Sequence, residues 1–364
     1  MLEWLVGRQP SRDSLPDRFM LVPGTGGVRF TFSDGTPAPY VVEMFEDHYL
    51  GNDQVFYSAL GCTHDPLPDS LPPDFEFGPN ATTLVPGKKL EPGPILEGTA
   101  YQTVVDFGVD LNDVAKYYPF AYDWRLDVRY NARLLLEVLQ NSNADTRWNI
   151  LCHSQGGLVV IAASLMAGSE QWLTMVRNVA FVAIPFVGTA RSMQAILEGA
   201  NFGKMLSPVF RKTARTWPAL YQMFPQYFCI KNEPAAGILN YGFWTSLGTD
   251  GQQLLNRAAN FWHWIDYHPF RAMDPNAIGF FLARSDAPNT PVYATADRVS
   301  PPTITTDLDV GDTLVPWTPT TQFLKWSGLE PRILPITGAL QKDHAYLLND
   351  AAVFRVAHQF LASP

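Results

Sequence analysis

The chain has 364 residues, of which 46% are hydrophobic and 13% aromatic, and its formal net charge is −9. This composition can fill a large hydrophobic core, and it excludes disordered and fibrous proteins. Nucleic acid is not expected as a partner, because a chain this acidic lacks the basic surface that neutralises phosphates. The short basic run at residues 211–215 is interpreted as a solvated helix face.

The three cysteines, Cys62, Cys152 and Cys229, are scattered and lack the spacing of metal ligands. This pattern favours a reducing compartment and predicts no disulfide framework. No cofactor and no metal are expected. The N-terminus has no charged start followed by a long apolar region, and no apolar run reaches membrane-spanning length. We therefore expect a cytoplasmic protein, and the sequence leaves its oligomeric state open.

The first expected strand covers residues 18–22, and the glycine-rich turn 23–27 ends it. Its glycine spacing is not that of a phosphate-binding loop, and no lysine follows. Such a turn can instead direct backbone N–H groups at a developing oxyanion. Thr25 is the candidate donor and Gly24 its neighbour, although an ordinary tight turn remains an alternative.

Residues 31–115 are rich in proline, glycine and aspartate, so we interpret them as an irregular, loop-rich insertion beside the site. A strand is then expected near residues 117–122, followed by a helix over about 126–140 with one apolar face. Asp123, Trp124 and Arg125 lie at this junction and are candidates to support the site. A structural ion pair between Asp123 and Arg125 is favoured over direct catalysis.

The apolar run 148–151 stops abruptly before His153-Ser154-Gln155-Gly156-Gly157, and a helix-period run follows. A strand, a sharp turn with serine at its apex and a helix form the nucleophile elbow, whose usual pattern is G-x-S-x-G. Cys152 occupies the place of the first glycine and is small enough to pack there. The N–H of Gln155 is the second candidate oxyanion donor, and His153 is assigned a packing or orienting role.

A continuous apolar strand is expected at residues 179–184, and the next at 291–296. Between them, residues 201–281 contain 17 Phe, Tyr or Trp, against 30 in the other 283 residues. This enrichment predicts an inserted cap with much apolar surface, although aromatic residues also build ordinary cores. We therefore assign residues 1–185 and 291–364 to the core and residues 186–290 to a cap or lid domain.

The chain closes with an acidic loop at 309–316, a strand at 332–336, a polar turn at 343–347 and a helix over about 350–361. Alternating strands and helices of this length predict an α/β fold. Its central sheet is expected to be mostly parallel, with helices on both faces.

Ser154 needs a base, because an alcohol is a poor nucleophile at neutral pH. His344 follows the last strand, where a loop can carry an imidazole over the serine, and Asp312 follows an earlier strand and can orient that imidazole. The order Ser154, Asp312, His344 is that of enzymes built on this elbow. Asp307 and Asp309 are rivals for the acid, but Gly311 permits a sharp turn beside Asp312.

The remaining histidines are interpreted as structural or surface residues: His48, His64, His263, His268 and His358. A glycosidase with two carboxylates is a weaker alternative, since acidic pairs are common in acidic proteins. A metal site is weaker still, because the sequence has no H-E-x-x-H motif or histidine cluster.

Six short motifs in this order resemble the lecithin:cholesterol acyltransferase family and its phospholipase relatives. They are Leu21-Val22-Pro23-Gly24, Tyr122-Asp123-Trp124-Arg125, His153-Ser154-Gln155-Gly156-Gly157, Pro185-Phe186-Val187-Gly188, Gly311-Asp312-Thr313-Leu314-Val315-Pro316 and Asp343-His344. Residues 217–225 are also similar to a cap segment of that family. The resemblance covers most of the chain from residue 21 onward.

This resemblance implies an α/β-hydrolase with a cap that forms an acyl–serine intermediate. Ser154, His344 and Asp312 would form the triad, and the N–H groups of Thr25 and Gln155 the oxyanion hole. The expected substrate is a small-molecule ester of bulky, apolar character, cleaved by an esterase or lipase-like reaction.

Two other functions remain open. The same triad could serve an acyltransferase or a lactone- or thioester-processing enzyme, or the fold could be a catalytically silent binding module. The aromatic cap also leaves open a weak contact with a membrane or lipid interface.

Overall fold

The computed structural model describes residues 18–32, 90–95, 100–110, 117–142, 147–199, 208–227, 229–230, 247–266, 268–286, 288–297, 303–334 and 343–363. The strands within these ranges are β1 (Phe19–Val22), β2 (Val28–Phe32), β3 (Leu90–Ile95), β4 (Tyr117–Pro119), β5 (Trp148–His153), β6 (Val176–Val182), β7 (Ile278–Leu282), β8 (Thr290–Asp297), β9 (Thr303–Asp309) and β10 (Arg332–Ile333). The α-helices are α2 (Gln102–Asp110), α3 (Val128–Gln140), α4 (Gln155–Met175), α5 (Ala190–Leu197), α6 (Pro208–Ala214), α7 (Pro218–Gln222), α8 (Gly248–Ile265), α9 (Trp317–Trp326) and α10 (Ala351–Leu361). Two 3₁₀ helices are η6 (Pro275–Ala277) and η8 (His344–Asn349).

Six strands form the central sheet in the order β10-β7-β6-β5-β1-β4, and every neighbouring pair is parallel. Every residue of β1, β5 and β7 is buried. Continuous apolar strands of this kind are typical of a parallel sheet covered on both faces. The sheet therefore has the architecture expected from the sequence, with β5 near its centre.

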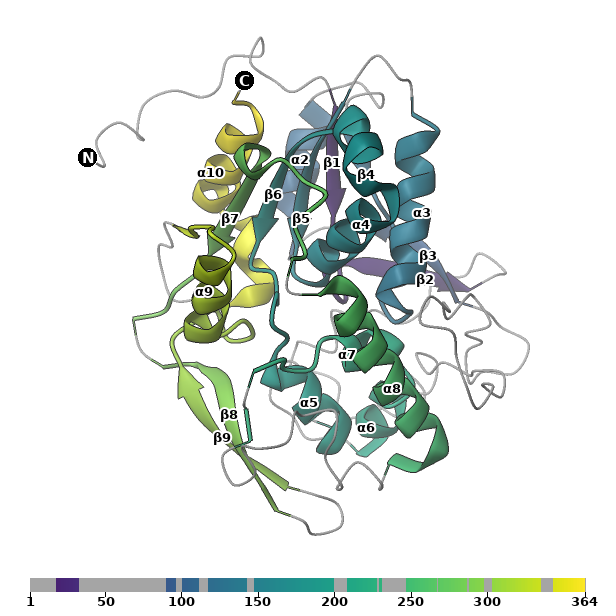
Figure 1. Ribbon diagram of the computed structural model, residues 1–364, viewed down its shortest axis with the longest axis vertical. Coiled ribbons are helices and arrows are strands. Elements are labelled where there is room, and N and C mark those ends of the chain that lie inside the picture. The colour runs from purple at the N-terminus through teal and green to yellow at the C-terminus, as the bar shows by residue number, and fades with distance from the viewer. Residues whose placement is uncertain are drawn as a thin grey trace.

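Helices cover both faces of the sheet: α3 and α4 pack together on one face, and α2 and α10 lie on the other (Figure 1). Asp127 caps α3 by accepting from the N–H of Arg129, and Asp350 caps α10 in the same way. The first ten residues of α4 are all buried. By length and composition alone, α4 is long and apolar enough to cross a membrane. Its burial explains this apolar composition, because a helix that is apolar on all sides is typical of a protein core.

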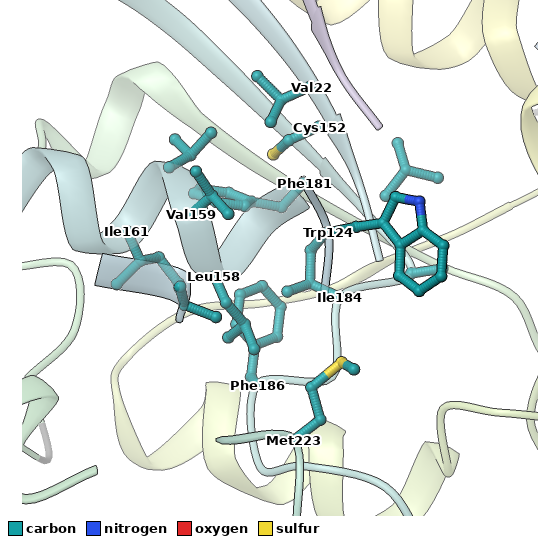
Figure 2. Close-up of a cluster of buried hydrophobic side chains, with 14 of the residues drawn as sticks. Val22, Trp124, Cys152, Leu158, Val159, Ile161, Phe181, Ile184, Phe186 and Met223 are labelled. Carbon is teal, nitrogen blue, oxygen red and sulfur yellow. The ribbon is translucent and has the colours of Figure 1, made fainter. Parts of the chain in front are cut away.

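Aromatic side chains fill the core near the ends of β6 and β7. The ring of Phe181 stacks on that of Phe280, with centroids 5.4 Å apart, and Phe186 and Phe270 meet both rings edge-on. Figure 2 shows Phe181 and Phe186 in one buried cluster with Leu158 of α4. Each such buried side chain contributes about 1.5–3 kcal/mol through the hydrophobic effect. The cluster therefore joins the sheet to the segment that leads into α5.

The helices α5 to α8 gather at one end of the sheet, below it in Figure 1, and α5 also contacts β8. Their aromatic residues are largely internal: Phe210, Trp217, Tyr221, Phe224 and Phe261 are all buried. Within the described residues, the aromatic enrichment thus builds a second part of the core. It does not by itself mark an exposed apolar lid.

A buried ionic cluster joins these helices to α3. Asp127 accepts from Arg257 of α8 at 2.6 Å and from Gln222 of α7 at 2.8 Å, and it also pairs with Arg129. Burial alone would raise the pKa of Asp127, but the two arginines outweigh it and hold that pKa below its usual value. The N-terminus of α3 is therefore a fixed point of contact with α7 and α8.

Two expectations about the elements are wrong. Residues 291–296 were expected to continue the central sheet, but β8 pairs antiparallel with β9 in a separate two-stranded sheet. The strand that extends the sheet is β7, inside the range assigned to the cap. This strand was missed because its sequence, Ile-Gly-Phe-Phe-Leu, continues the aromatic-rich segment that was assigned to the cap. The division of the chain into core and cap otherwise stays a prediction.

The second correction concerns residues 31–115, which were expected to be irregular. β3 pairs with β2, and α2 is a regular helix that packs against η8 and α10. Pro92 and Pro94 are tolerated in β3 because a two-stranded ribbon leaves one edge of the strand without ladder hydrogen bonds. Residues 33–89, 96–99 and 111–116 of this segment lie outside the described part of the chain.

Candidate active site

Ser154 lies at the junction of β5 and α4 in a rarely populated backbone conformation, with φ 52° and ψ −132°. Such a conformation costs on the order of 1–3 kcal/mol and persists only when the surrounding structure enforces it. Here the N–H of Ser154 donates to the carbonyl of Val182, and that of Gly157 donates back to Ser154. The strand and the helix on either side therefore impose the turn of the nucleophile elbow.

Small residues surround the serine because no space is left for a side chain. A Cβ on Gly24 would lie 2.5 Å from Ser154 Cβ. A Cβ on Gly156 would collide with the backbone of Val22 and Pro23, and one on Gly157 with the side chain of Ile184. The glycines of the predicted motif are thus explained by the close approach of β1, β5 and α4.

Cys152, which replaces the first glycine of the usual pattern, is completely buried on β5. Its thiol lies 3.4 Å from the carbonyl oxygen of Ala180 on β6 and appears among the core side chains in Figure 2. Burial raises the pKa of the Cys152 thiol well above its ordinary value. It is therefore a neutral packing residue, as the sequence suggested.

His344 brings the other two predicted triad residues to the serine. Its Nε2 lies 2.7 Å from Ser154 Oγ, and its Nδ1 lies 2.9 Å from Asp312 Oδ2. All three side chains are buried, with 5%, 6% and 1% exposure for Ser154, His344 and Asp312. The structure therefore brings together three residues that are 190 and 32 positions apart in the chain.

The other contacts of Asp312 and His344 define the hydrogen-bond direction at each group of this triad. The Asp312 carboxylate accepts from the N–H groups of Leu314 and Val315, at 3.1 and 2.7 Å. Since a carboxylate can only accept, His344 carries its proton on Nδ1, and Nε2 is left to accept from the serine hydroxyl. The backbone N–H of His344 also donates to the Asp312 carbonyl at 2.8 Å. This arrangement can remove a proton from Ser154.

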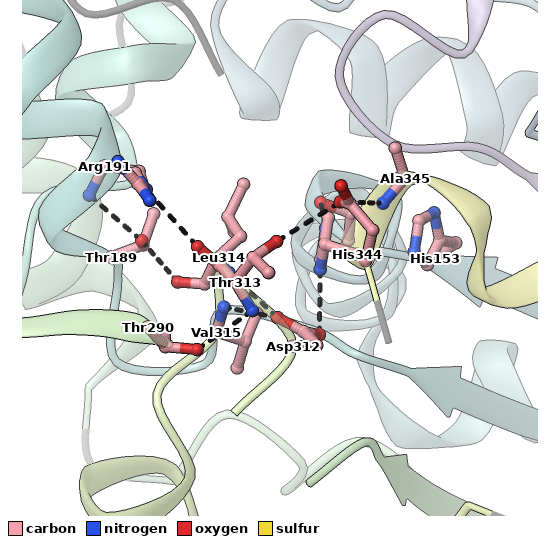
Figure 3. Close-up of polar contacts among 12 residues, drawn as sticks. His153, Thr189, Arg191, Thr290, Asp312, Thr313, Leu314, Val315, His344 and Ala345 are labelled. Carbon is pink, nitrogen blue, oxygen red and sulfur yellow. Dashed lines mark hydrogen bonds and ion pairs between the residues drawn. The ribbon is translucent and has the colours of Figure 1, made fainter. Parts of the chain in front are cut away.

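Contacts from α5 brace the loop that carries Asp312, as Figure 3 shows. Thr189 Oγ1 donates to the carbonyl of Leu314 at 2.7 Å, and Arg191 Nε donates to that of Thr313 at 3.3 Å. Burial lowers the pKa of Arg191, while the nearby Asp343 opposes that shift. Thr313 has a φ of 79°, which a non-glycine residue adopts only when its surroundings require it.

Thr25 and Gln155, the two predicted oxyanion donors, are in direct contact. Thr25 Oγ1 donates to Gln155 Oε1 at 2.6 Å, and Gln155 Nε2 donates to the carbonyl of Trp124 at 2.9 Å. Gln155 is the first residue of α4, so its N–H has no acceptor within the helix and points along the positive end of the helix dipole. The two segments can therefore present N–H groups to an anion beside Ser154.

The other predicted supporting residues form the wall next to this loop. Arg125 and Asp123 make a buried ion pair at 2.7 Å, as favoured from the sequence, and Arg125 also lies over the ring of Phe30. Trp124 Nε1 donates to the carbonyl of Val28, and its ring meets that of Trp217 edge-on. These residues join β2 to Trp217, which lies directly before α7.

His153 packs against the base without replacing it. Its ring lies 4.8 Å from that of His344, centroid to centroid, and its Nδ1 lies 2.8 Å from the hydroxyl of Tyr101. Burial lowers the pKa of His153 well below its ordinary value, and the neighbouring His344 adds to this shift. His153 is therefore neutral, in agreement with an orienting role.

Three residues of the site were missed in the sequence: Tyr101, Tyr122 and Arg191. Tyr101 falls in the segment interpreted as irregular, and no motif marks it. Tyr122 belongs to the Tyr-Asp-Trp-Arg motif and could have been found from it. The only sequence signal for Arg191 is its position shortly after residues 185–188. Among the described residues, no group of three or more His, Cys, Asp or Glu side chains could hold a metal ion.

Comparison with known proteins finds a family similarity for the segment that contains the elbow. Residues 94–261 match the family model described as lecithin:cholesterol acyltransferase. This stretch of the chain is therefore similar to that family. The match includes Ser154 but ends before Asp312 and His344, so their assignment depends on geometry. A search of curated proteins finds no match to the sequence.

One solved structure shares the fold over nearly the whole chain. A chain in the crystal structure of the Tle4–Tli4 complex aligns with a TM-score of 0.62 at 13% identity, covering 95% of this chain and 98% of that one. Phospholipase PlaB from Legionella pneumophila aligns with a TM-score of 0.29 at 11% identity, over 57% of this chain and 45% of its own. The first alignment supports an α/β-hydrolase fold, and the second is too weak to add to it. The family match supports an ester-acting hydrolase or acyltransferase.

Proposed function

We propose that this protein is a serine hydrolase that cleaves a carboxylic ester of a bulky, apolar substrate through an acyl–serine intermediate. The observation that carries this proposal is the buried chain of hydrogen bonds from Ser154 Oγ through His344 to Asp312, at 2.7 and 2.9 Å. The lipid character of the substrate is supported by the family match, because lecithin and cholesterol are both lipids.

In the first half of the reaction, Ser154 Oγ attacks the carbonyl carbon of the ester while His344 Nε2 takes the serine proton. Asp312 keeps the imidazole oriented and stabilises its positive charge. The N–H groups of Thr25 and Gln155 donate to the oxyanion of the tetrahedral intermediate. When the intermediate collapses, His344 returns the proton to the leaving alkoxide and the acyl group stays on Ser154.

In the second half, His344 takes a proton from water as the water oxygen attacks the acyl carbon. The carboxylic acid then leaves and Ser154 regains its proton. An alcohol in place of this water would give a new ester by the same steps. Acyl transfer is therefore the second candidate, and it is favoured by the match to an acyltransferase family.

The test of the proposal is active-site labelling with a fluorophosphonate, read by intact mass, on the wild type and on Ser154→Ala. We expect one adduct on the wild type and none on the variant. Loss of a triad serine should also lower the esterase rate by roughly 10⁴- to 10⁶-fold. Equal p-nitrophenyl esterase activity in the two proteins would exclude the proposed function.

A second measurement separates hydrolysis from transfer and defines the substrate. A series of p-nitrophenyl esters from acetate to palmitate reports the preferred acyl length, and long chains should be preferred. Product analysis with and without a long-chain alcohol then gives the ratio of new ester to free acid. Free acid as the sole product under both conditions would rule against transfer.

A further inference from the structure

The peptide between Pro23 and Gly24 lies directly before Thr25, and two buried tyrosines hold it from opposite ends. The Tyr122 hydroxyl donates to the carbonyl of Pro23 at 2.7 Å. The N–H of Gly24 donates to the hydroxyl oxygen of Tyr101 at 2.8 Å. Tyr122 and Tyr101 are 0% and 2% exposed. Both polar groups of one peptide unit are therefore fixed by side chains from distant segments.

We call Tyr101, Tyr122 and the Pro23–Gly24 peptide that they hold the tyrosine clamp. The direction of each hydrogen bond in this clamp can be assigned. The Gly24 N–H can only donate, so the Tyr101 oxygen accepts from it, and the tyrosine proton is free to go to His153 Nδ1 at 2.8 Å. His153 then carries its own proton on Nε2. Burial raises the pKa of Tyr101 and Tyr122, and it lowers that of His153. All three side chains thus stay neutral, and these donor and acceptor roles persist through the neutral pH range.

The clamp also fits the shape of the loop around it. The ring of Tyr101 fills the place where a Cβ on Gly27 would stand, since that atom would lie 2.7 Å from Tyr101 Cε2. The loop closes on itself through the N–H of Gly27, which donates to the carbonyl of Gly24 at 3.0 Å. Tyr101 meets His153 edge-on, and His153 in turn packs on the ring of His344.

We propose that Tyr101 and Tyr122 are positioning residues that fix the Pro23–Gly24 peptide and thereby aim the N–H of Thr25 at the oxyanion. The inference rests on the proposed function, because it assigns a purpose to the same site. Rotation of this peptide would turn the backbone of Thr25, whose N–H is the donor that follows it. His153 completes the arrangement, because it accepts from Tyr101 and packs on the base. Neither tyrosine contacts the serine or its proton.

Loss of either tyrosine hydroxyl should therefore lower the rate of the chemical step and leave substrate binding nearly unchanged. A stabilising donor to the oxyanion acts mainly in the transition state, and losing one costs about 10²–10³-fold in kcat. Loosening the donor without removing it should cost less. We expect Tyr101→Phe and Tyr122→Phe each to lower kcat by about 10- to 100-fold with KM changed by less than about threefold.

The experiment measures kcat and KM of both variants with a p-nitrophenyl ester, per active site titrated with fluorophosphonate. Titration removes any loss that arises from misfolded protein. The inhibition constant of an alkyl boronic acid is measured in parallel, because its tetrahedral serine adduct requires the oxyanion donors. We expect that constant to rise by the same factor as kcat/KM falls. A role in stability alone would change the titre and the Tm and would leave these ratios unaltered.

Tyr221→Phe is the matched control. Tyr221 is also completely buried, and its hydroxyl donates to a backbone carbonyl, that of Arg215, at 2.9 Å in the cap. We expect this variant to lose a comparable amount of Tm while kcat per site stays within about twofold of wild type.

The possible outcomes separate the inference from the proposed function. Wild-type kcat per titrated site in both Tyr101→Phe and Tyr122→Phe, with an inactive Ser154→Ala, would overturn the clamp and leave the hydrolase intact. Full activity in Ser154→Ala would overturn the proposed function itself. If Tyr101→Phe does not fold, Tyr122→Phe carries the test alone, because it releases the other end of the same peptide.

Discussion

The two halves of the site are built in different ways. The nucleophile half, from β5 through Ser154 to α4, is one continuous stretch whose strained turn is enforced by backbone hydrogen bonds and close glycine contacts. The proposed acid–base half consists of Asp312 on a loop that Thr189 and Arg191 brace, and of His344 at the start of η8. A local motif thus sets the first half, whereas long-range contacts set the second.

This difference gives the two halves different tolerances to substitution. In the nucleophile half, a side chain added at Gly156 would collide with the backbone of Val22 and Pro23, and one added at Gly24 would collide with Ser154 itself. In the acid–base half, loss of one brace leaves others in place, such as the Thr290 hydroxyl that accepts from the N–H of Thr313. We therefore expect substitutions to be severe at the reacting groups and at the elbow, and graded along the braces.

The largest effect is expected from Asp312→Asn, which keeps the size of the side chain but favours the wrong tautomer of His344. By analogy with other triads, kcat should fall by about 10⁴-fold. The measurement is kcat on a p-nitrophenyl ester, with circular dichroism to establish that the variant is folded. Asp307→Asn is the control for the rival acid and should stay near wild type. A loss of less than tenfold in Asp312→Asn would mean that another group orients the base.

The next largest effect is expected from Gly24→Ala. Its Cβ would lie 2.5 Å from Ser154 Cβ, and relief requires the loop or the nucleophile to move by about an ångström. Misplacement of this size can lower the rate by about 10²-fold. Measurement of kcat and Tm on the same preparation tests this prediction. We expect kcat to fall by more than the loss of folded protein, as judged from Tm, can explain. Unchanged kcat and Tm would show that the loop is free to yield.

A smaller effect is expected from Arg191→Met, which removes the donor to the Thr313 carbonyl but keeps the apolar stem. Because Thr189 and Thr290 still hold the same loop, we predict a loss of about tenfold in kcat/KM. Arg191→Lys keeps the charge near Asp343 and should recover part of the rate. The prediction fails if Arg191→Met matches wild type or is as inactive as Asp312→Asn.

The smallest effect concerns stability and pH, at the helix that follows the base. His358 of α10 packs on the rings of Phe107 and Phe354, and burial lowers its pKa from 6.5 to about 4. Because the folded pKa lies below the unfolded one, its contribution is complete above about pH 6.5 and is lost as the pH falls towards 4. Because a pKa difference of one corresponds to about 1.36 kcal/mol, the total between 6.5 and about 4 is at most roughly 3.4 kcal/mol.

We therefore expect His358→Leu to reduce the acid sensitivity of α10. Urea unfolding at pH 7.5 and at pH 4.5 measures it, and the variant should lose less stability between these two conditions than wild type. His263→Leu at an exposed position of α8 is the control and should show no such difference. An equal loss in His358→Leu and wild type would mean that other groups control the acid response.

The sequence by itself determined the local features of this protein. The elbow at Ser154 and its glycines follow from a short contiguous pattern, because the strand, turn and helix are neighbours in the chain. The helices α3 and α10 were predicted to within two residues, since each combines an apolar period with an aspartate cap. The order of Ser154, Asp312 and His344 was also readable, because it is the order found in enzymes built on this elbow.

Only the tertiary structure decided which segments meet. It placed β7 in the sheet and left β8 and β9 as a separate pair, a choice that depends on available partners and not on the apolar pattern of each strand. It brought Tyr101 and Tyr122 to the two ends of one peptide, and Arg191 to the loop of Asp312. These contacts join residues that lie far apart in the chain, and no local propensity encodes such a meeting. For that reason, Ser154, Asp312 and His344 could be proposed from the sequence as candidates, whereas the residues that contact and brace them could not.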